Sequence, residues 1–335
     1  MIHHIADRKP ANLPEGHPPV LLVVVDTEEE FDWSKPFDRN SVATTSIAAQ
    51  PLAHTRVFDA FGAVPTYVVD WPVASTPASV DVLRGLQDAG KCEIGTHLHP
   101  WVTPPHTEAV NTFNSYAGNL PQELEFAKLE RITQEITRNF GRAPRMFKAG
   151  RYGLGAGTAA AIEKLGYEID ASVVPYTSFR GDGGPDFSSA TPDPFWFDVN
   201  GRRMLELPVT TGFAGALKGL GPGVYPQLTS PLARKLRMPA IASRSGMLER
   251  IRLTPEGCSA DDMIRLLDAM ADSGCRVFTL TYHSPSLAIG HTPYVRDQAG
   301  LDAFLASIER VCRHFKERLG GTFMSASALQ ARLLT

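Results

Sequence analysis

PVLLVVVDTEEEF, residues 19 to 31, joins a continuous apolar run to a cluster of acidic residues. A short run that is apolar at every position is typical of a strand buried on both faces of a parallel sheet. Parity along this strand places Asp26 and Glu28 on one side and Thr27 on the other. Two carboxylates that converge at a strand end repel each other unless a cation separates them or one is protonated. The stretch therefore predicts a parallel α/β fold whose first strand ends at a metal site.

Seven further segments carry short runs rich in Val, Ile and Phe, each followed by helical periodicity or by a loop with Gly and Pro. The expected strands span residues 19–26, 64–70, 91–99, 145–150, 167–174, 204–211, 275–283 and 321–327. The expected helices span residues 45–61, 76–89, 121–140, 156–165, 260–273 and 301–318. The alternation predicts a distorted (β/α) barrel of mainly parallel strands, and an open doubly wound sheet is the alternative.

The length of 335 residues fits a single barrel domain. We expect an N-terminal extension at 1–18, a catalytic domain at 19–330 and an insertion over the barrel at 213–258. The insertion has several Gly and Pro, little strand pattern and these basic residues: Lys218, Arg234, Lys235, Arg237, Arg244, Arg250 and Arg252. It is either a solvated cap or a positive surface for an anionic substrate or a membrane.

Composition narrows the functional classes. A net charge of -3 argues against a nucleic-acid partner, because binding to phosphates requires a concentration of Lys and Arg. The first residues lack the apolar core of a secretion signal, and no segment approaches the roughly 20 apolar residues of a membrane span. We therefore expect a cytoplasmic protein.

The four cysteines are scattered without a CxxC pair and are expected to be reduced and structural.

Barrel enzymes place their chemistry at the C-terminal ends of the strands. Five of the expected strands end in polar residues suited to catalysis: VVVDTEEEF, GTHLHPW, FKAGRYG, ELPVTT and LTYHSPS. Such residues occur on many surface loops, but five strand ends of this kind among eight expected strands point to one rim. There is no GxSxG elbow, HExxH helix or GxxxxGK[ST] loop, and GLGAG lacks dinucleotide spacing.

EIGTHLHPW, residues 93 to 101, places two histidines two positions apart. If the strand continues through them, the imidazoles of His97 and His99 project to the same side. Imidazole nitrogens together with a carboxylate such as Glu28 suit zinc, with cobalt, nickel or iron as alternatives, and three protein ligands leave a position for water. Packing of two ordinary histidines at the end of a buried strand is the competing interpretation.

Further candidates surround this group. Arg151 could pair with Asp26 and keep it ionised, and Lys148 is the competing partner. His283, at the end of an apolar strand, could protonate a leaving group.

Four other residues complete the expected site. Tyr152, Trp101 and His291 are candidates for contact with the substrate, and His291 could instead be a lid residue or simply exposed. Asp170 could orient a catalytic group, or could equally end a strand.

The order of these motifs resembles the polysaccharide deacetylases of carbohydrate esterase family 4, which carry the NodB homology domain. The resemblance covers roughly residues 19 to 327 and implies a barrel of about seven strands with a divalent metal, commonly zinc. By position, Glu28, His97 and His99 match the metal ligands, and Asp26 matches the base. His283 matches the acid and Arg151 the arginine motif. The family usually has Asp as the acidic ligand and histidines four apart, so this chain resembles a divergent branch.

The resemblance implies a metal-dependent hydrolase of a C–N amide bond, which removes the acetyl group from an N-acetylated sugar. A metal-activated water would attack, with Asp26 as base and His283 as acid. The expected partner is a carbohydrate or another small N-acylated substrate, either soluble or lipid-linked at a membrane face. The alternatives are a cyclic amide or ureide hydrolase of a related barrel, and a metal-free carbohydrate-binding or assembly protein.

Overall fold

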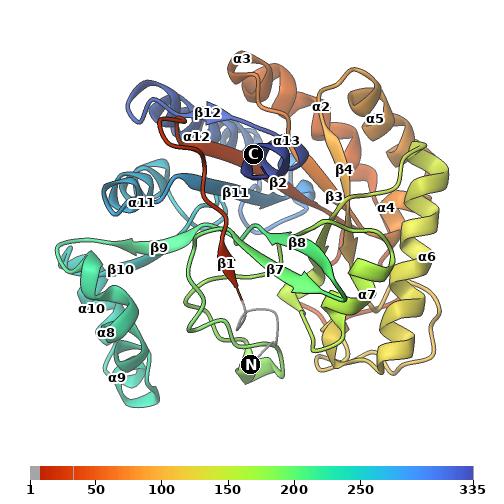
Figure 1. Ribbon diagram of the computed structural model, residues 1–335, viewed down its shortest axis with the longest axis horizontal. Helices are drawn as coiled ribbons and strands as arrows, with labels where there is room; N and C mark the ends of the chain where they lie inside the picture. Colours follow the sequence, from red (N-terminus) through yellow and green to blue (C-terminus); the bar gives the residue numbers. More distant parts are fainter. Residues whose placement is uncertain (1–7, 33, 335) are drawn as a thin grey trace.

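The computed structural model describes residues 8–32 and 34–334, without the side chains of Pro231 and Arg234. At its centre seven strands run parallel in the order β8-β6-β5-β4-β3-β2-β11 and curve into a barrel (Figure 1). They are β2 (Val20–Thr27), β3 (Thr66–Val69), β4 (Glu93–Leu98), β5 (Met146–Ala149), β6 (Ile169–Asp170), β8 (Arg202–Glu206) and β11 (Val277–His283). The distorted (β/α) barrel expected from the sequence is confirmed.

Short strands extend the barrel at its edges. β7 (Phe195–Val199) pairs antiparallel with β8, and β1 (Lys9–Pro10) pairs antiparallel with β7. β12 (Thr322–Phe323) pairs with the start of β2. The antiparallel strands were not expected from the sequence, because their polar positions interrupt the apolar pattern.

The gap between β8 and β11 is bridged by two extended segments. Thr281 donates its backbone N–H to Leu253 O at 3.1 Å, and Leu253 N–H donates to Thr210 O at 2.9 Å. Thr210 also accepts the backbone N–H of Thr279 on its hydroxyl, at 2.7 Å. The barrel is therefore closed by a seam of single hydrogen bonds in place of a regular ladder.

Helices cover the outside of the barrel (Figure 1). The principal ones are α5 (Pro77–Asp88), α6 (Gln122–Phe140), α7 (Thr158–Lys164), α11 (Ala260–Asp272) and α12 (Gln298–Glu317). α13 (Ala326–Leu333) instead packs Ala326 and Leu329 against the apolar residues inside the barrel. Residues 45–61 form a succession of short turns: a 3₁₀ helix (Thr45–Ala49), α2 (Gln50–Ala53), a π-helix (His54–Phe58) and α3 (Asp59–Phe61). α4 (Trp71–Ser75) follows β3 directly.

The two faces of β2 show how the sequence pattern positions the site. Val20, Leu22 and Val24 pack inside the barrel with Val68 and Met146, whereas the residues between them pack against the helices outside. Asp26 occupies the next inward position along the same strand. The apolar filling of the barrel thus ends where the polar side chains begin.

Residues 211–252 form an excursion from the barrel. β9 (Thr211–Ala214) and β10 (Glu249–Arg252) pair antiparallel as a separate two-stranded sheet. Between them, α8 (Gly221–Leu228), α9 (Pro231–Lys235) and α10 (Met238–Arg244) extend away from the barrel, at the lower left of Figure 1. No helix in the described part of the chain has both the length and the apolar character needed to cross a membrane.

Candidate metal centre and active site

A cavity of about 370 Å³ lies at the C-terminal ends of the parallel strands. Its wall collects most of the candidate site residues, together with aromatic and basic side chains. It is lined by Asp26, Glu28, Phe31, Lys35, Phe37, His97, His99, Ala149, Arg151, Tyr152, Arg252, Thr254, Glu256, Thr281, His283 and Tyr294.

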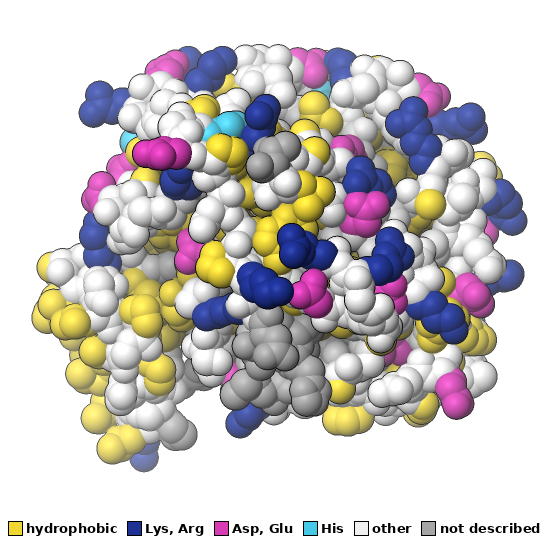
Figure 2. Space-filling view, in the orientation of Figure 1, with side chains coloured by type: hydrophobic (Ala, Val, Ile, Leu, Met, Phe, Trp, Pro, Cys, Tyr) yellow, Lys and Arg dark blue, Asp and Glu magenta, His cyan; other side chains and the backbone are white. Residues whose placement is uncertain are grey.

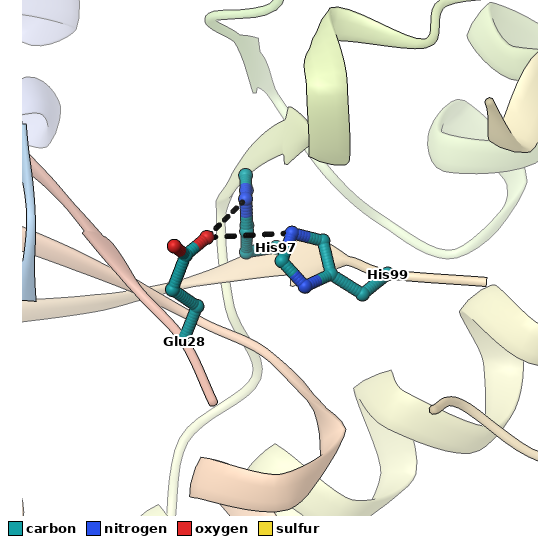
Figure 3. A group of neighbouring side chains, drawn as sticks. All are labelled: Glu28, His97 and His99. Carbon is teal, nitrogen blue, oxygen red and sulfur yellow. Dashed lines mark ion pairs between the residues drawn. The ribbon is translucent and has the colours of Figure 1, made fainter. Parts of the chain in front are cut away.

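Glu28, His97 and His99 converge at the base of this cavity (Figure 3). Glu28 Oε2 lies 3.7 Å from His97 Nε2 and 3.4 Å from His99 Nε2. Ligand atoms in a tetrahedral site with bonds of about 2.1 Å lie about 3.4 Å apart, so these separations match a zinc-like centre. The other oxygen, Glu28 Oε1, is buried without a hydrogen-bond partner. The three side chains therefore fit a divalent cation.

The protonation of Glu28 also fits a site built for a cation. Burial raises its pKa to about 8; the carboxylates of Asp26 and Asp70 add to this effect, and His283 opposes it. A positive ion at this position would favour the ionised form of the Glu28 carboxyl and lower its pKa. The isolated carboxyl is protonated at neutral pH, whereas a metal ligand would be ionised.

Hydrogen bonds to the opposite ring nitrogens orient the two histidines. His97 Nδ1 lies 3.0 Å from Lys148 O, and His99 Nδ1 lies 2.7 Å from Glu29 Oε2. A carbonyl or carboxylate oxygen accepts a hydrogen bond, so the Nδ1 of each ring carries the proton. Each Nε2 therefore presents its lone pair toward Glu28. Burial lowers the pKa of His97 well below its ordinary value and that of His99 to about 4. Both rings are therefore neutral, as metal ligands must be.

Trp101 and Gly150 fix the position of His99. The Trp101 ring stacks on the imidazole, with centroids 4.2 Å apart, and its indole N–H donates to Glu29 Oε1 at 2.8 Å. A Cβ at Gly150 would lie 2.4 Å from His99 Cδ2, so a residue without a side chain is required there. Trp101, a candidate substrate contact in the sequence, lies behind the metal site and does not line the cavity.

Asp26 is held by Lys148. The Lys148 ammonium group donates to both carboxylate oxygens, at 2.7 Å to Oδ2, and to Thr281 Oγ1 at 3.1 Å. Burial alone would raise the pKa of Asp26, but Lys148, together with His283, holds it below its ordinary value. Asp26 is therefore an ionised carboxylate inside an almost fully buried site.

Arg151 lies near this pair but does not contact Asp26. It donates to Asp182 Oδ2 at 3.3 Å and stacks over Tyr116 at 4.2 Å. Its φ angle of 53° and that of Tyr152, 59°, turn the chain sharply after β5. Of the two alternatives in the sequence, the structure thus places Lys148 against Asp26, and Arg151 forms part of the outer cavity wall.

His283 lies on the other side of Asp26, with Nε2 3.8 Å from Asp26 Oδ2. Its Nδ1 lies 2.6 Å from Glu256 Oε2, and its backbone N–H donates to Glu256 Oε1 at 3.0 Å. Ser286 also donates to Glu256 Oε1, at 2.6 Å. Burial disfavours a charged imidazole, but Glu256, Glu28 and Asp26 raise the pKa of His283 well above its ordinary value. His283 is therefore protonated, as a general acid requires.

The remaining sequence candidates have different surroundings. Tyr152 lines the cavity and accepts a hydrogen bond from Arg252 at 3.2 Å. His291 Nδ1 lies 3.2 Å from Glu30 Oε2, at a neighbouring hollow outside this cavity.

Asp170 also lies outside the cavity, in a buried carboxyl pair. It is the register partner of Glu206 on β8, and it accepts the backbone N–H of Ser172 at 3.0 Å. Asp170 Oδ2 and Glu206 Oε2 have no hydrogen-bond donor, and a shared proton would supply one. Burial raises the pKa of Asp170 to about 6 and that of Glu206 well above its ordinary value. Ser172 in turn accepts the N–H of Ala149, so the pair supports the end of β5.

Sequence reasoning missed several residues around the cavity. Glu256 lies within the expected insertion, where no strand or helix pattern singled it out. Thr281 could have been found, because it occupies the inward position two residues before His283. Glu29, the residue after Glu28 in the same acidic run, was not singled out as a partner of His99, which it contacts through Oε2.

The sequence matches no protein-family model, and no curated protein is similar enough in sequence to count as a relative. Solved structures do match. PuuE allantoinase is 15% identical with a TM-score of 0.57, over 99% of this chain and 95% of that chain. A protein of Pseudomonas aeruginosa PAO1 described as a probable polysaccharide deacetylase is 13% identical with a TM-score of 0.54, over 97% and 93%.

A branching enzyme of the GH57 type from Thermococcus kodakaraensis is 13% identical with a TM-score of 0.53, over 93% of this chain and 71% of that chain. At these identities the likeness establishes the fold. The resemblance to polysaccharide deacetylases inferred from the motif order is thus confirmed at the level of architecture. The chain adopts the distorted barrel that these deacetylase, allantoinase and branching-enzyme structures share.

Proposed function

We propose that this protein is a metal-dependent hydrolase of C–N amide bonds that removes the acetyl group from an N-acetylated sugar. The convergence of Glu28, His97 and His99 beside Asp26 and His283 in one cavity carries the proposal. The shared fold with a protein described as a polysaccharide deacetylase and with an allantoinase supports it.

Glu28, His97 and His99 would hold the metal, with zinc first and cobalt, nickel or iron as alternatives. A bound divalent cation would supply Lewis acidity and lower the pKa of a water ligand to about 7. The neutral imidazoles and the orphaned Glu28 oxygen are the features of this chain that suit such an ion.

Asp26 and His283 divide the proton transfers. The ionised carboxylate of Asp26, aimed by Lys148, would take a proton from the attacking water. The protonated His283, aimed by Glu256, would give a proton to the departing amine nitrogen. Because the two groups have pKa values displaced in opposite directions, each is in the required state at the same pH.

The cavity favours a small substrate. Its volume of about 370 Å³ lies at the lower end of the range for small-molecule sites. Phe31, Phe37, Tyr152 and Tyr294 supply apolar faces against which a sugar ring can pack. A soluble sugar precursor, or the terminal sugar of a lipid-linked one, therefore suits the site better than the middle of a polymer.

Hydrolysis of a cyclic ureide is the second candidate. The allantoinase structure covers nearly the whole of both chains, and the small cavity suits a compact ring as well as a sugar. The metal centre and the acid–base pair would serve either substrate.

The test combines metal analysis with product assays. Metal-depleted protein is reloaded with zinc and incubated separately with N-acetylated monosaccharides and with allantoin, and acetate release and ring opening are measured. We expect zinc-dependent acetate release, and loss of metal and activity in the His97→Ala, His99→Ala double variant. Zinc-dependent ring opening alone would favour the ureide hydrolase. Failure to take up any transition metal would instead favour a metal-free binding protein.

A further inference from the structure

The excursion between β9 and β10 exposes an apolar surface whose residues do not line the cavity. We call residues 218–247, which carry α8, α9 and α10, the arm. Seven of the twelve large apolar side chains exposed in the described chain belong to it. They are Leu220, Val224, Leu232, Leu236, Met238, Ile241 and Met247. Figure 2 shows this concentration of apolar side chains on the arm, at the lower left. Exposed apolar patches of this kind mark surfaces that contact a protein or a membrane.

The arm is also strongly basic. From Thr211 to Leu248 the sequence contains five basic residues and no Asp or Glu, although the whole chain has a net charge of -3. Lys235, Arg237 and Arg244 are exposed and have no ion-pair partner among the residues that the structure describes. Lys218 pairs with Asp272 of α11 at 2.9 Å, which attaches the base of the arm to the barrel.

Apolar and basic side chains alternate at one corner of the arm. α9 ends at Lys235 and α10 begins at Met238, and Arg237 between them has a left-handed backbone with φ of 56°. Leu236 is 59% exposed and Met238 is 39% exposed. The corner therefore presents two apolar side chains, Leu236 and Met238, that alternate along the chain with two cations, Lys235 and Arg237.

The charge of the arm distinguishes between two partners that could cover it, a second copy of this protein and an anionic membrane. In a symmetric dimer the same patch meets itself, so Lys235, Arg237 and Arg244 of one arm would face the same three cations of the other. No acidic residue on the arm could offset that repulsion. An anionic lipid surface satisfies both features: the headgroups attract the cations, and the acyl boundary receives the leucine, isoleucine and methionine side chains.

We propose that the arm docks the protein on anionic phospholipid membranes, with Lys235, Arg237 and Arg244 at the headgroups and Leu232, Leu236 and Ile241 inserted between them. The docking depends on the arm alone, so it stands whatever reaction the cavity catalyses. Because β10 connects the arm to the cavity wall at Arg252, docking would also keep the cavity beside the membrane.

Sedimentation with lipid vesicles tests the proposal. The full-length protein is mixed with vesicles of phosphatidylcholine alone, or of phosphatidylcholine containing one quarter phosphatidylglycerol. We expect binding to the anionic vesicles only, weakened by added salt. A basic residue near an anionic surface contributes roughly a factor of five, so Lys235→Gln, Arg237→Gln, Arg244→Gln together should weaken binding about a hundredfold. Leu232→Asp, Leu236→Asp, Ile241→Asp should abolish it.

The control removes the same charge from another surface. Arg310, Arg313 and Lys316 lie on α12, and their replacement by glutamine should leave vesicle binding unchanged. Circular dichroism and thermal unfolding show whether each variant is folded. Absence of binding to anionic vesicles, equal binding to neutral vesicles, or equal loss in the α12 control would overturn the proposal. So would a dimer in solution that the arm variants dissociate, since the surface would then belong to a second copy.

Discussion

Lys148 on β5 and Asp26 on β2 form an ion pair across the interior of the barrel, with Lys148 Nζ 2.7 Å from Asp26 Oδ2. Both side chains are almost fully buried. The strands that carry them are separated by β3 and β4 in the sheet. The pair therefore connects opposite sides of the polar end of the barrel and positions the expected base beside His283.

Replacing Lys148 by methionine should destabilise the protein by about 3 kcal/mol, because it leaves the Asp26 carboxylate buried without its partner. The measurement is urea unfolding at pH 7. Adding Asp26→Asn to Lys148→Met should recover part of the lost stability, since the second change removes the uncompensated charge. If the double variant is less stable than Lys148→Met alone, the ion pair does not account for the loss.

Asp26→Asn should reduce turnover at least about a hundredfold while leaving metal content nearly unchanged, because the proposed base is not one of the three ligands. Metal analysis and the rate of acetate release are compared in the same preparation. Glu28→Gln is the matched change at a ligand and should instead weaken metal binding. Near-normal turnover of Asp26→Asn would remove that residue from its proposed role.

Glu29→Gln should weaken metal affinity about tenfold to a hundredfold, because Glu29 holds the Nδ1 proton of His99 and so directs Nε2 toward the metal. Competition with a chromogenic chelator measures the affinity. Glu30→Gln is a suitable control, since Glu30 pairs with His291 outside the cavity. Equal affinities of the two variants would show that Glu29 does not orient the ligand.

Glu256→Gln should shift the alkaline limb of the pH–rate profile to lower pH. The carboxylate of Glu256 is the principal neighbour that raises the pKa of His283, and an amide cannot replace it. The acid then loses its proton at a lower pH, so activity is lost first at the alkaline end. Ser286→Ala removes the hydrogen bonds of this hydroxyl to Glu256 and Thr292 but keeps the Glu256 carboxylate, so it should shift the limb less. An unmoved limb in Glu256→Gln would show that another group is the acid.

Glu206→Gln should make the protein less sensitive to pH. Asp170 has a pKa of about 6 in the folded chain, and that of Glu206 is also raised, so folding binds protons that unfolding releases. The resulting stability is present near pH 4 and is lost as pH rises through 6. Relative to wild type, Glu206→Gln should gain about 1 to 3 kcal/mol between pH 4 and pH 8. Thermal unfolding at both pH values measures this change, and a constant difference would contradict a shared proton.

The parallel strands could be predicted where a short, mainly apolar run ends in a polar residue, as it does in β2 and β11. Parity along the first strand separated the side of Asp26 from that of Thr27, and the structure shows Val20, Leu22 and Val24, which share the parity of Asp26, filling the barrel. Residues 204–211, expected as one strand, instead contain the end of β8 and the start of β9. The chain leaves the barrel between these strands, a change of direction that leaves no break in the apolar pattern.

Contacts in the site between residues far apart in the sequence were harder to predict than those within one segment. Local spacing was enough to place His97 and His99 together, since His97 lies near the end of β4 and His99 follows the last residue of that strand. It could not choose between Lys148 and Arg151 as the partner of Asp26, because the sharp turn after β5 depends on left-handed angles at two residues other than glycine. It also gave no sign of Glu256, whose role depends on the path of an irregular segment from β10 to the barrel.

The seam formed by Thr210, Leu253 and Thr281 has a consequence for protein engineering. The segment that returns from the arm supplies both Leu253, which closes the wall, and Glu256, which orients His283. Deleting residues 213–258 would therefore remove Leu253 and open the barrel wall. It would also remove Glu256 and leave the His283 ring without the carboxylate that orients it. A minimal version of this protein must retain β9, β10 and the residues up to Glu256, and only the tip between the two strands can be exchanged for a short turn.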